Sequence, residues 1–223
     1  MAGSDQDASQ PEVLDALAIA DLKLKKPEEA VELLQKALSK FPNDLKSAGA
    51  LAAIQFGQHN FAEAEETLKK AVAQAPQSAQ AALALANLYL LENKKLEAEP
   101  ELRRAIQLDP SNAPALLSLG ALQLQTGRAA NADETHRKVS AIPGANLAHI
   151  HAAFLFQQGK KAEAVEELEK LAKAPKADHA ARLRLVGAYV VMGRTDDALH
   201  YLAACYRATR KTRMRCFFEA AST

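Results

Sequence analysis

The sequence predicts an all-α solenoid of six helix–turn–helix units of about 34 residues each, and three observations favour it. Five prolines recur at intervals of 34, 34, 33 and 32 residues: Pro42, Pro76, Pro110, Pro143 and Pro175. Counted from Pro11, the twentieth position of every unit is alanine: Ala30, Ala64, Ala98, Ala132, Ala164 and Ala198. Short polar residues and glycines stand at fixed places in the same period. Each unit is therefore expected to fold into two closely packed helices that touch only the neighbouring units.

The period divides the chain into a leader, an array and a tail. The units of the array are 11–44, 45–78, 79–112, 113–144, 145–178 and 179–212. Residues 1–10 are polar, with neither a basic start nor an apolar middle, and are expected to form a disordered leader rather than a signal peptide. Residues 213–223 are a partial seventh repeat, a capping helix or a frayed basic tail, and the sequence leaves these three alternatives open.

Capping residues predict where the helices begin and end. A short polar residue stands just before the first helix of four units, where it can accept from free backbone N–H groups: Asp44, Ser78, Asn112 and Asp178. Gly127, Gly159 and Gly193 lie between the two helices of their units, where a left-handed residue ends the first helix without steric cost. Pro100 falls inside a second helix, so we expect that helix to kink or to begin late.

Large apolar residues at positions 7 and 24 of the units are the expected core. Position 7 is occupied by Leu17, Leu51, Leu85, Leu119, His151 and Leu185, and position 24 by Leu34, Leu68, Leu102, His136, Leu168 and Leu202. Position 8 is small in five units, which allows two antiparallel helices to approach closely. We expect His151 to be a hydrogen-bonded core residue, because it replaces leucine there.

This pattern resembles the tetratricopeptide repeat family, in which positions 8 and 20 are small, positions 7 and 24 are large and apolar, and position 32 is proline. The resemblance covers Pro11 to about Thr212, and units four and five depart from it because their proline comes one position early. It implies a superhelical scaffold that binds proteins. The fold is well indicated and the partner is not, because such repeats serve many unrelated partners.

Composition and charge exclude several classes of protein. With 28 basic and 27 acidic residues, the net charge of +1 gives no electrostatic reason to expect nucleic acid or an anionic membrane as a partner. The most apolar stretch, 79–91, is too short to span a bilayer. Two cysteines are too few for a disulfide framework, so the compartment stays open between the cytoplasm and, if a signal was removed, the cell envelope.

No pattern of catalytic or metal-ligating residues occurs in the sequence. There is no glycine-rich phosphate loop, no HExxH, no CxxC and no Gly-x-Ser-x-Gly elbow. His149 and His151 lie two residues apart on an expected helix and therefore point to different faces, which argues against joint chelation of a metal. We expect no catalytic residues, no cofactor and no metal, and any enzyme activity would have to reside outside this chain.

The resemblance directs attention to the concave face, which first helices line with positions 2, 5, 6, 9, 12 and 13. At these positions the chain is apolar and mostly small, which predicts a groove for an apolar or helical peptide. The expected partner-binding residues are Leu83, Asn87, Leu117, Ala121, His149, Ile150 and Arg184. Asn87 and Arg184 would fix the direction of the peptide. They do not form the carboxylate clamp of chaperone-binding relatives, because no lysine occupies position 5.

Two alternatives remain open. The alanines and leucines of the concave face could simply complete the packing between units, because exposed alanine is common. Alternatively, the chain could be a self-association module that forms a homo-oligomer through its apolar end at Phe217 and Phe218. The varied surface between units favours a natural repeat region of a bacterial envelope or assembly protein.

Overall fold

The computed structural model describes residues 14, 16–19, 26–143, 146–173 and 179–220, without the side chains of residues 179 and 208–220. All regular elements in this part of the chain are α-helices. They fall into two units, one ending at Leu122 and one beginning at Gln123. The expected leader and the expected cap Asp178 lie outside the described residues.

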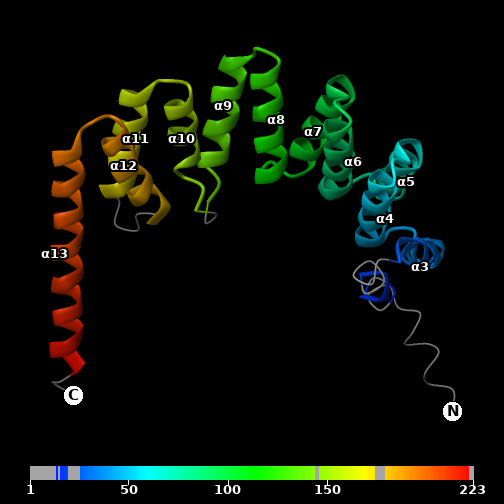
Figure 1. Cartoon of the computed structure of the whole chain (residues 1–223), viewed down its shortest axis with the longest axis horizontal. Coiled ribbons are helices and arrows are strands. Elements are labelled where there is room, and N and C mark those ends of the chain that lie inside the picture. The colour runs from blue at the N-terminus through cyan, green and yellow to red at the C-terminus, as the bar shows by residue number, and fades with distance from the viewer. Residues whose placement is uncertain (1–13, 15, 20–25, 144–145, 174–178, 221–223) are drawn as a thin grey trace. The chain divides into compact units, whose positions relative to one another are not determined.

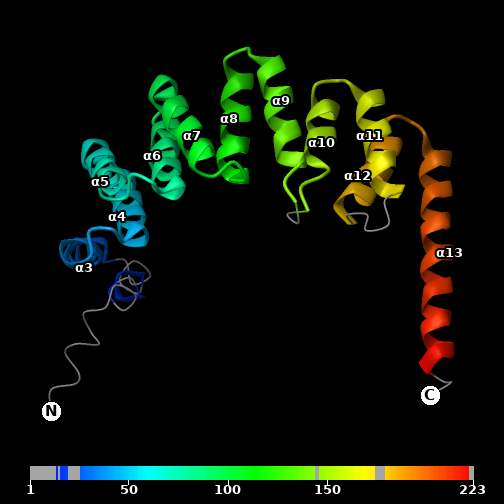
Figure 2. The same cartoon turned by 180° about the vertical axis from the view of Figure 1, so that it is seen from behind.

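Consecutive helices of the first unit form antiparallel hairpins, which Figures 1 and 2 show from opposite sides. These helices are α3 (Pro27–Lys40), α4 (Leu45–Gly57), α5 (Phe61–Gln74), α6 (Ala79–Leu91) and α7 (Lys95–Leu108). Helix α8 (Ala113–Gln125) begins in this unit and ends in the next. Thus α4, α6 and α8 begin at the first residues of the second, third and fourth repeats.

The second unit continues the alternation of first and second helices. Its helices are α9 (Ala129–Ser140), α10 (Ile150–Gln157), α11 (Lys161–Lys173), α12 (His179–Val191) and α13 (Thr195–Ala220). Helix α10 begins five residues later than the expected start of its repeat and has only eight residues. Residues 213–220 continue α13 without a break, so no separate first helix starts there.

Three of the expected helix caps are confirmed. The side chain of Asp44 accepts from the backbone N–H of Lys46 at 3.1 Å. Ser78 accepts from Ala81 N–H at 3.2 Å and Asn112 accepts from Ala115 N–H at 3.0 Å. Each bond satisfies a backbone donor that has no partner within its own helix, which is why α4, α6 and α8 start at these residues.

In repeats two to six, the turn between the two helices has a left-handed residue at position 15. Gly127, Gly159 and Gly193 adopt φ angles of 75°, 80° and 72°, as the sequence predicted. His59 and Asn93 occupy the same position in repeats two and three, with φ angles of 64° and 58°. The turn geometry is therefore a property of the repeat, and glycine is only the residue that adopts it with least strain.

The core follows the predicted positions. The six alanines at position 20 are 0–3% exposed, and Leu34, Leu68, Leu102 and Leu168 at position 24 are 0–4% exposed. Leu202 is an exception at 48% exposure. In the other repeats, the first helix of the next repeat covers the second helix, but among the described residues no such helix follows α13. Leu17 is also exposed, at 47%, since its helix buries Leu14 and Ala18 instead. The expectation that Leu17 and Leu202 belong to the core is wrong.

Pro100 does not delay the start of its helix. Helix α7 is continuous from Lys95 and contains Pro100 in its second turn. The side chain of Pro100 is exposed, while Ala98, Leu102 and Ala105 on the opposite side are completely buried. Packing of these residues outweighs the one backbone hydrogen bond that proline cannot make.

Within the described part of the chain, no helix combines the length and the hydropathy that crossing a bilayer requires.

Candidate functional site

A groove opens between the first helices α10 and α12 of the second unit. It has a volume of about 350 Å³. Its lining comes mainly from α10 and α12, with one leucine from α11: Ala152, Ala153, Phe156, Gln157, Leu168, Arg184, Gly187, Ala188 and Val191. We call this set the α10–α12 groove. Ala153, Phe156, Arg184, Gly187 and Val191 occupy positions 6, 9, 12 or 13, which the sequence assigned to the concave face.

Small side chains keep the groove open. Ala152 and Ala188 are buried and belong to the cluster that packs α10 against α12, together with Ala181 and Leu185. Gly187 has no heavy atom within 4 Å of the place where a Cβ would stand, so its backbone faces open space. A bound chain could therefore approach the helix backbone closely at this point.

The lining has one aromatic wall and one charge. Phe156 is half-buried, and the ammonium group of Lys161 lies 5.7 Å from its ring centroid. Arg184 is exposed and is the only charged residue of the lining. Among the described residues, no carboxylate forms an ion pair with Arg184. The groove thus combines apolar surface with the positive charge of Arg184.

Of the residues predicted in the second unit, Arg184 alone lines this groove. His149 is 7% exposed and immediately precedes α10, which leaves little of its side chain for a partner to contact. Its role in partner binding stays a prediction. Ile150 is half-buried at the first residue of α10.

The other predicted residues lie on α6 and α8 in the first unit. Asn87 and Ala121 are exposed and Leu117 is half-buried. Leu83 packs against a cluster that contains Leu102, Leu119 and other residues, so it contributes to the packing between repeats. A continuous strip from α6 to α10 would cross between the two units and stays a prediction.

Phe156, Gln157 and Val191 were not predicted as partner-binding residues, although the groove is lined by all three. The signal that could have found them is their place in the repeat. They occupy positions 12 and 13, which belong to the concave face. In other repeats, these positions also hold apolar or amide side chains: Phe56, Leu90 and Gln125.

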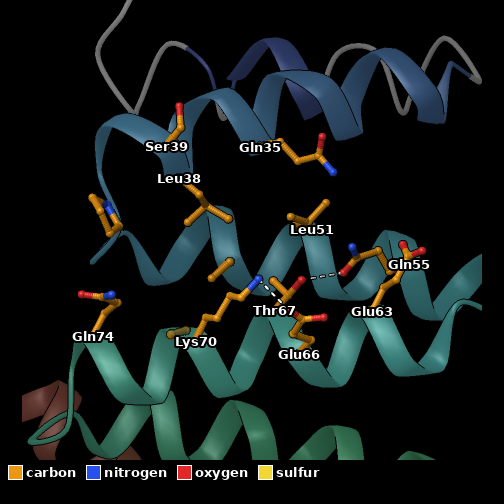
Figure 3. A pocket seen from close by; sticks show the side chains of 13 residues that line it. Gln35, Leu38, Ser39, Leu51, Gln55, Glu63, Glu66, Thr67, Lys70 and Gln74 are labelled. Carbon is orange, nitrogen blue, oxygen red and sulfur yellow. Dashed lines mark hydrogen bonds and ion pairs between the residues drawn. The ribbon is translucent and has the colours of Figure 1, made fainter.

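A second cavity, of about 600 Å³, lies in the first unit between α3, α4 and α5 (Figure 3). Among its lining residues, Thr67 donates a hydrogen bond of 2.9 Å to the buried Gln55, and Lys70 forms an ion pair with Glu66. Thr135 and Gln123 repeat the first of these bonds in the second unit, also at 2.9 Å. The recurrence indicates that the threonine–glutamine pair joins the two helices of a repeat.

Glu65 of α5 joins two consecutive repeats. Its carboxylate pairs with Lys69, four residues later on the same helix, at 2.7 Å. Glu65 also accepts from Lys94 at 2.7 Å and from the hydroxyl group of Tyr89 at 3.3 Å, both in the next repeat. Hydrogen bonds from Lys69 and Lys94 lower the pKa of Glu65 to about 2. The cluster is structural, because its groups are already engaged with one another.

In the part of the chain that the structure describes, no group of three or more histidine, cysteine, aspartate or glutamate residues could hold a metal ion.

Comparison with known proteins identifies the fold. Two family models, each described as a tetratricopeptide repeat, match residues 21–88 and 83–133. The chain belongs to the tetratricopeptide repeat (TPR) family. A search of the curated proteins finds no match.

Solved structures agree with this assignment. The Pseudomonas aeruginosa protein pilF is 22% identical, covers 91% of this chain and 92% of its own, and superimposes with a TM-score of 0.61. MamA is 24% identical over 75% of this chain and 92% of its own, with a TM-score of 0.55. A thermophilic TPR protein from Thermus thermophilus is 22% identical over 81% of this chain and 99% of its own, with a TM-score of 0.53. At this level of identity the similarity shows the fold, an all-α solenoid, and the TPR fold supports a role as a protein-interaction scaffold.

Proposed function

We propose that this TPR protein is a non-enzymatic scaffold that binds an apolar or helical peptide segment in the α10–α12 groove. The observation that carries the proposal is the cavity at the predicted concave positions of two consecutive first helices. TPR proteins are generally interaction scaffolds rather than enzymes, which agrees with this role.

Shape supports an apolar occupant. Ala153 and Gly187 leave room for a backbone or a large side chain, and Phe156 and Val191 offer apolar surface to it. A few buried anchor side chains dominate the affinity of most protein interfaces. The occupant should therefore contribute at least one large apolar side chain.

Charge supports an acidic residue beside that anchor. Arg184 is exposed in the lining and the described residues offer it no carboxylate. A planar guanidinium group recognises a carboxylate with two parallel hydrogen bonds, which fixes the direction of the bound chain. We therefore infer a segment in which an acidic residue lies close to the apolar anchor.

The proposal is tested by selecting peptides from a random display library on the immobilised protein and measuring their affinities for variants. Gly187→Leu is chosen to fill the groove, since a Cβ at this position has no heavy atom within 4 Å. We expect the selected peptides to be apolar and acidic and to lose about tenfold or more in affinity for this variant. Gly57→Leu is the matched control, because Gly57 also faces open space in an α-helix. Equal affinity for both variants would refute the α10–α12 groove as the binding site.

A homo-oligomer is the second candidate function, and exposed apolar residues on α13 favour it. Leu199, Leu202 and Tyr206 are 60%, 48% and 69% exposed. Large apolar side chains grouped on one helix are typical of an interaction surface. Light scattering separates the two candidates, because a mass that stays monomeric at all concentrations would contradict self-association.

A further inference from the structure

His151 lies at a joint of three helices in the second unit. It belongs to α10, is 5% exposed, and contacts Asp133 of α9 and Glu167 of α11. Helices α9 and α10 belong to consecutive repeats, so this contact joins repeat four to repeat five. The expectation of a hydrogen-bonded core histidine is confirmed, but its partners are carboxylates.

Each ring nitrogen of His151 faces a carboxylate oxygen. Nδ1 lies 2.7 Å from Glu167 Oε2, and Nε2 lies 3.3 Å from Asp133 Oδ1. An imidazolium ion carries a proton on both nitrogens and can donate to both carboxylates. A neutral imidazole has a single N–H group, so one nitrogen lone pair would then face a carboxylate oxygen. The geometry fits the charged ring and disfavours the neutral one.

Two cationic side chains lie beside Asp133 at this joint. On α9, Arg137 bonds Asp133 at 2.9 Å, and Lys160, in the turn before α11, lies 3.8 Å from it. Burial opposes ionisation of Asp133, but hydrogen bonds from Arg137 and His151 outweigh it and lower the pKa of Asp133. The carboxylate of Asp133 is thus available to a protonated His151 near neutral pH.

Two further histidines and the apolar side of α12 lie around α10. His136 of α9 stacks on Phe154 with centroids 4.4 Å apart, and its Nδ1 lies 2.7 Å from the carbonyl oxygen of Ala132. His149 is buried in the turn before α10. On the side of α12, the cluster around Ala152 is apolar, and Arg184 lies across the α10–α12 groove.

Helix α10 contains His151 and also contributes part of the lining of the α10–α12 groove. Phe156 follows His151 by five residues, which places the two side chains about 140° apart around the helix. With only eight residues, α10 gains little stability from its own backbone. Apart from packing, His151 anchors it with its ring and with its backbone N–H, which donates to Ser140 Oγ at 2.8 Å.

We propose that proton loss from His151 loosens α10 from α9 and α11 and so makes the α10–α12 groove dependent on pH. The groove is ordered while His151 is protonated and bridges Asp133 and Glu167. As pH rises and the ring becomes neutral, one of the two bridges is lost and α10 opens more often. The consequence for partner binding rests on the proposed function, but the change in α10 does not.

The test is amide hydrogen exchange of the full chain at pH values between about 5.5 and 8, the range in which histidines change charge. After correction for the intrinsic rate, we expect protection of residues 152–157 to fall about tenfold across this range, as expected for one charge-assisted hydrogen bond. His151→Gln keeps a donor and an acceptor but cannot become charged, so its protection should not depend on pH. His200→Gln is the control, because His200 is exposed on α13, and it should behave like the unmodified protein.

Two results would overturn the inference. One is an equal pH dependence of protection in the unmodified protein and in His151→Gln. The other is a nitrogen NMR signal of a neutral His151 ring throughout this pH range. If exchange changes as expected but Gly187→Leu does not affect the selected peptides, then the joint is pH-sensitive and the proposed function of the groove is wrong. The two claims therefore fail separately.

Discussion

Most of the interactions of Glu65 are made with residues of the repeat that follows it. The i, i+4 pair with Lys69 could be predicted from the sequence, because helical spacing alone places the two side chains together. The bonds with Tyr89 and Lys94 could not, because they depend on how α6 and the turn after it pack against α5. His151 is similar, since its carboxylate partners are 16 and 18 residues away.

Replacing Glu65 by glutamine should lower the free energy of unfolding by about 1–2 kcal/mol at pH 7, because two charge-assisted bonds are weakened. The pKa of Glu65 is lowered from 4.5 to about 2 in the folded protein. Its contribution is therefore complete above pH 4.5 and is lost as pH falls towards 2. Urea denaturation at several pH values measures this difference. Glu66→Gln is the control, since its pair with Lys70 is exposed, and an equal effect in both variants would contradict the prediction.

Helix boundaries could be predicted wherever a side chain fixes them. Asp44, Ser78 and Asn112 cap their helices as expected, and position 15 ends the first helix of repeats two to six. The late start of α10 could not be predicted, because Ser140 of the preceding helix accepts from its backbone. The course of α13 through residues 213–220 was not predicted either, since the repeat pattern gives no stop signal there.

Pro100 allows the cost of one missing backbone hydrogen bond in α7 to be measured without a change in packing. Pro100→Ala would supply the missing N–H to the carbonyl of Leu96, and no buried contact would be lost because Pro100 is exposed. We expect the free energy of unfolding to rise by about 1–3 kcal/mol. Pro110→Ala is the control, because Pro110 is exposed in the turn after α7 and should give no such gain. Thermal and urea denaturation of both variants measure the effect, and equal stability would show that α7 already accommodates the proline without cost.

At the scale of the whole molecule, the family could be predicted from the sequence and the lining of the candidate groove only in part. Alanine at position 20 recurs in all six repeats, and a proline at position 31 or 32 recurs in the first five, because packing and helix termination demand them. Packing places no such demand on the concave face, so its residues vary between repeats. Of the predicted residues, Arg184 lines the observed groove, while His149 is buried and Leu83 serves packing.

The most direct test of the account is a charge exchange across the α10–α12 groove. Arg184→Glu should weaken a selected acidic peptide by about tenfold or more, because a carboxylate would then face a carboxylate. Replacing the acidic residue of the peptide by lysine should restore affinity for Arg184→Glu and weaken it for the unmodified protein. Arg207→Glu, on the exposed surface of α13, controls for net charge. Isothermal titration of the four pairings measures the coupling: a restored affinity is the predicted result, and four equal affinities would contradict the account.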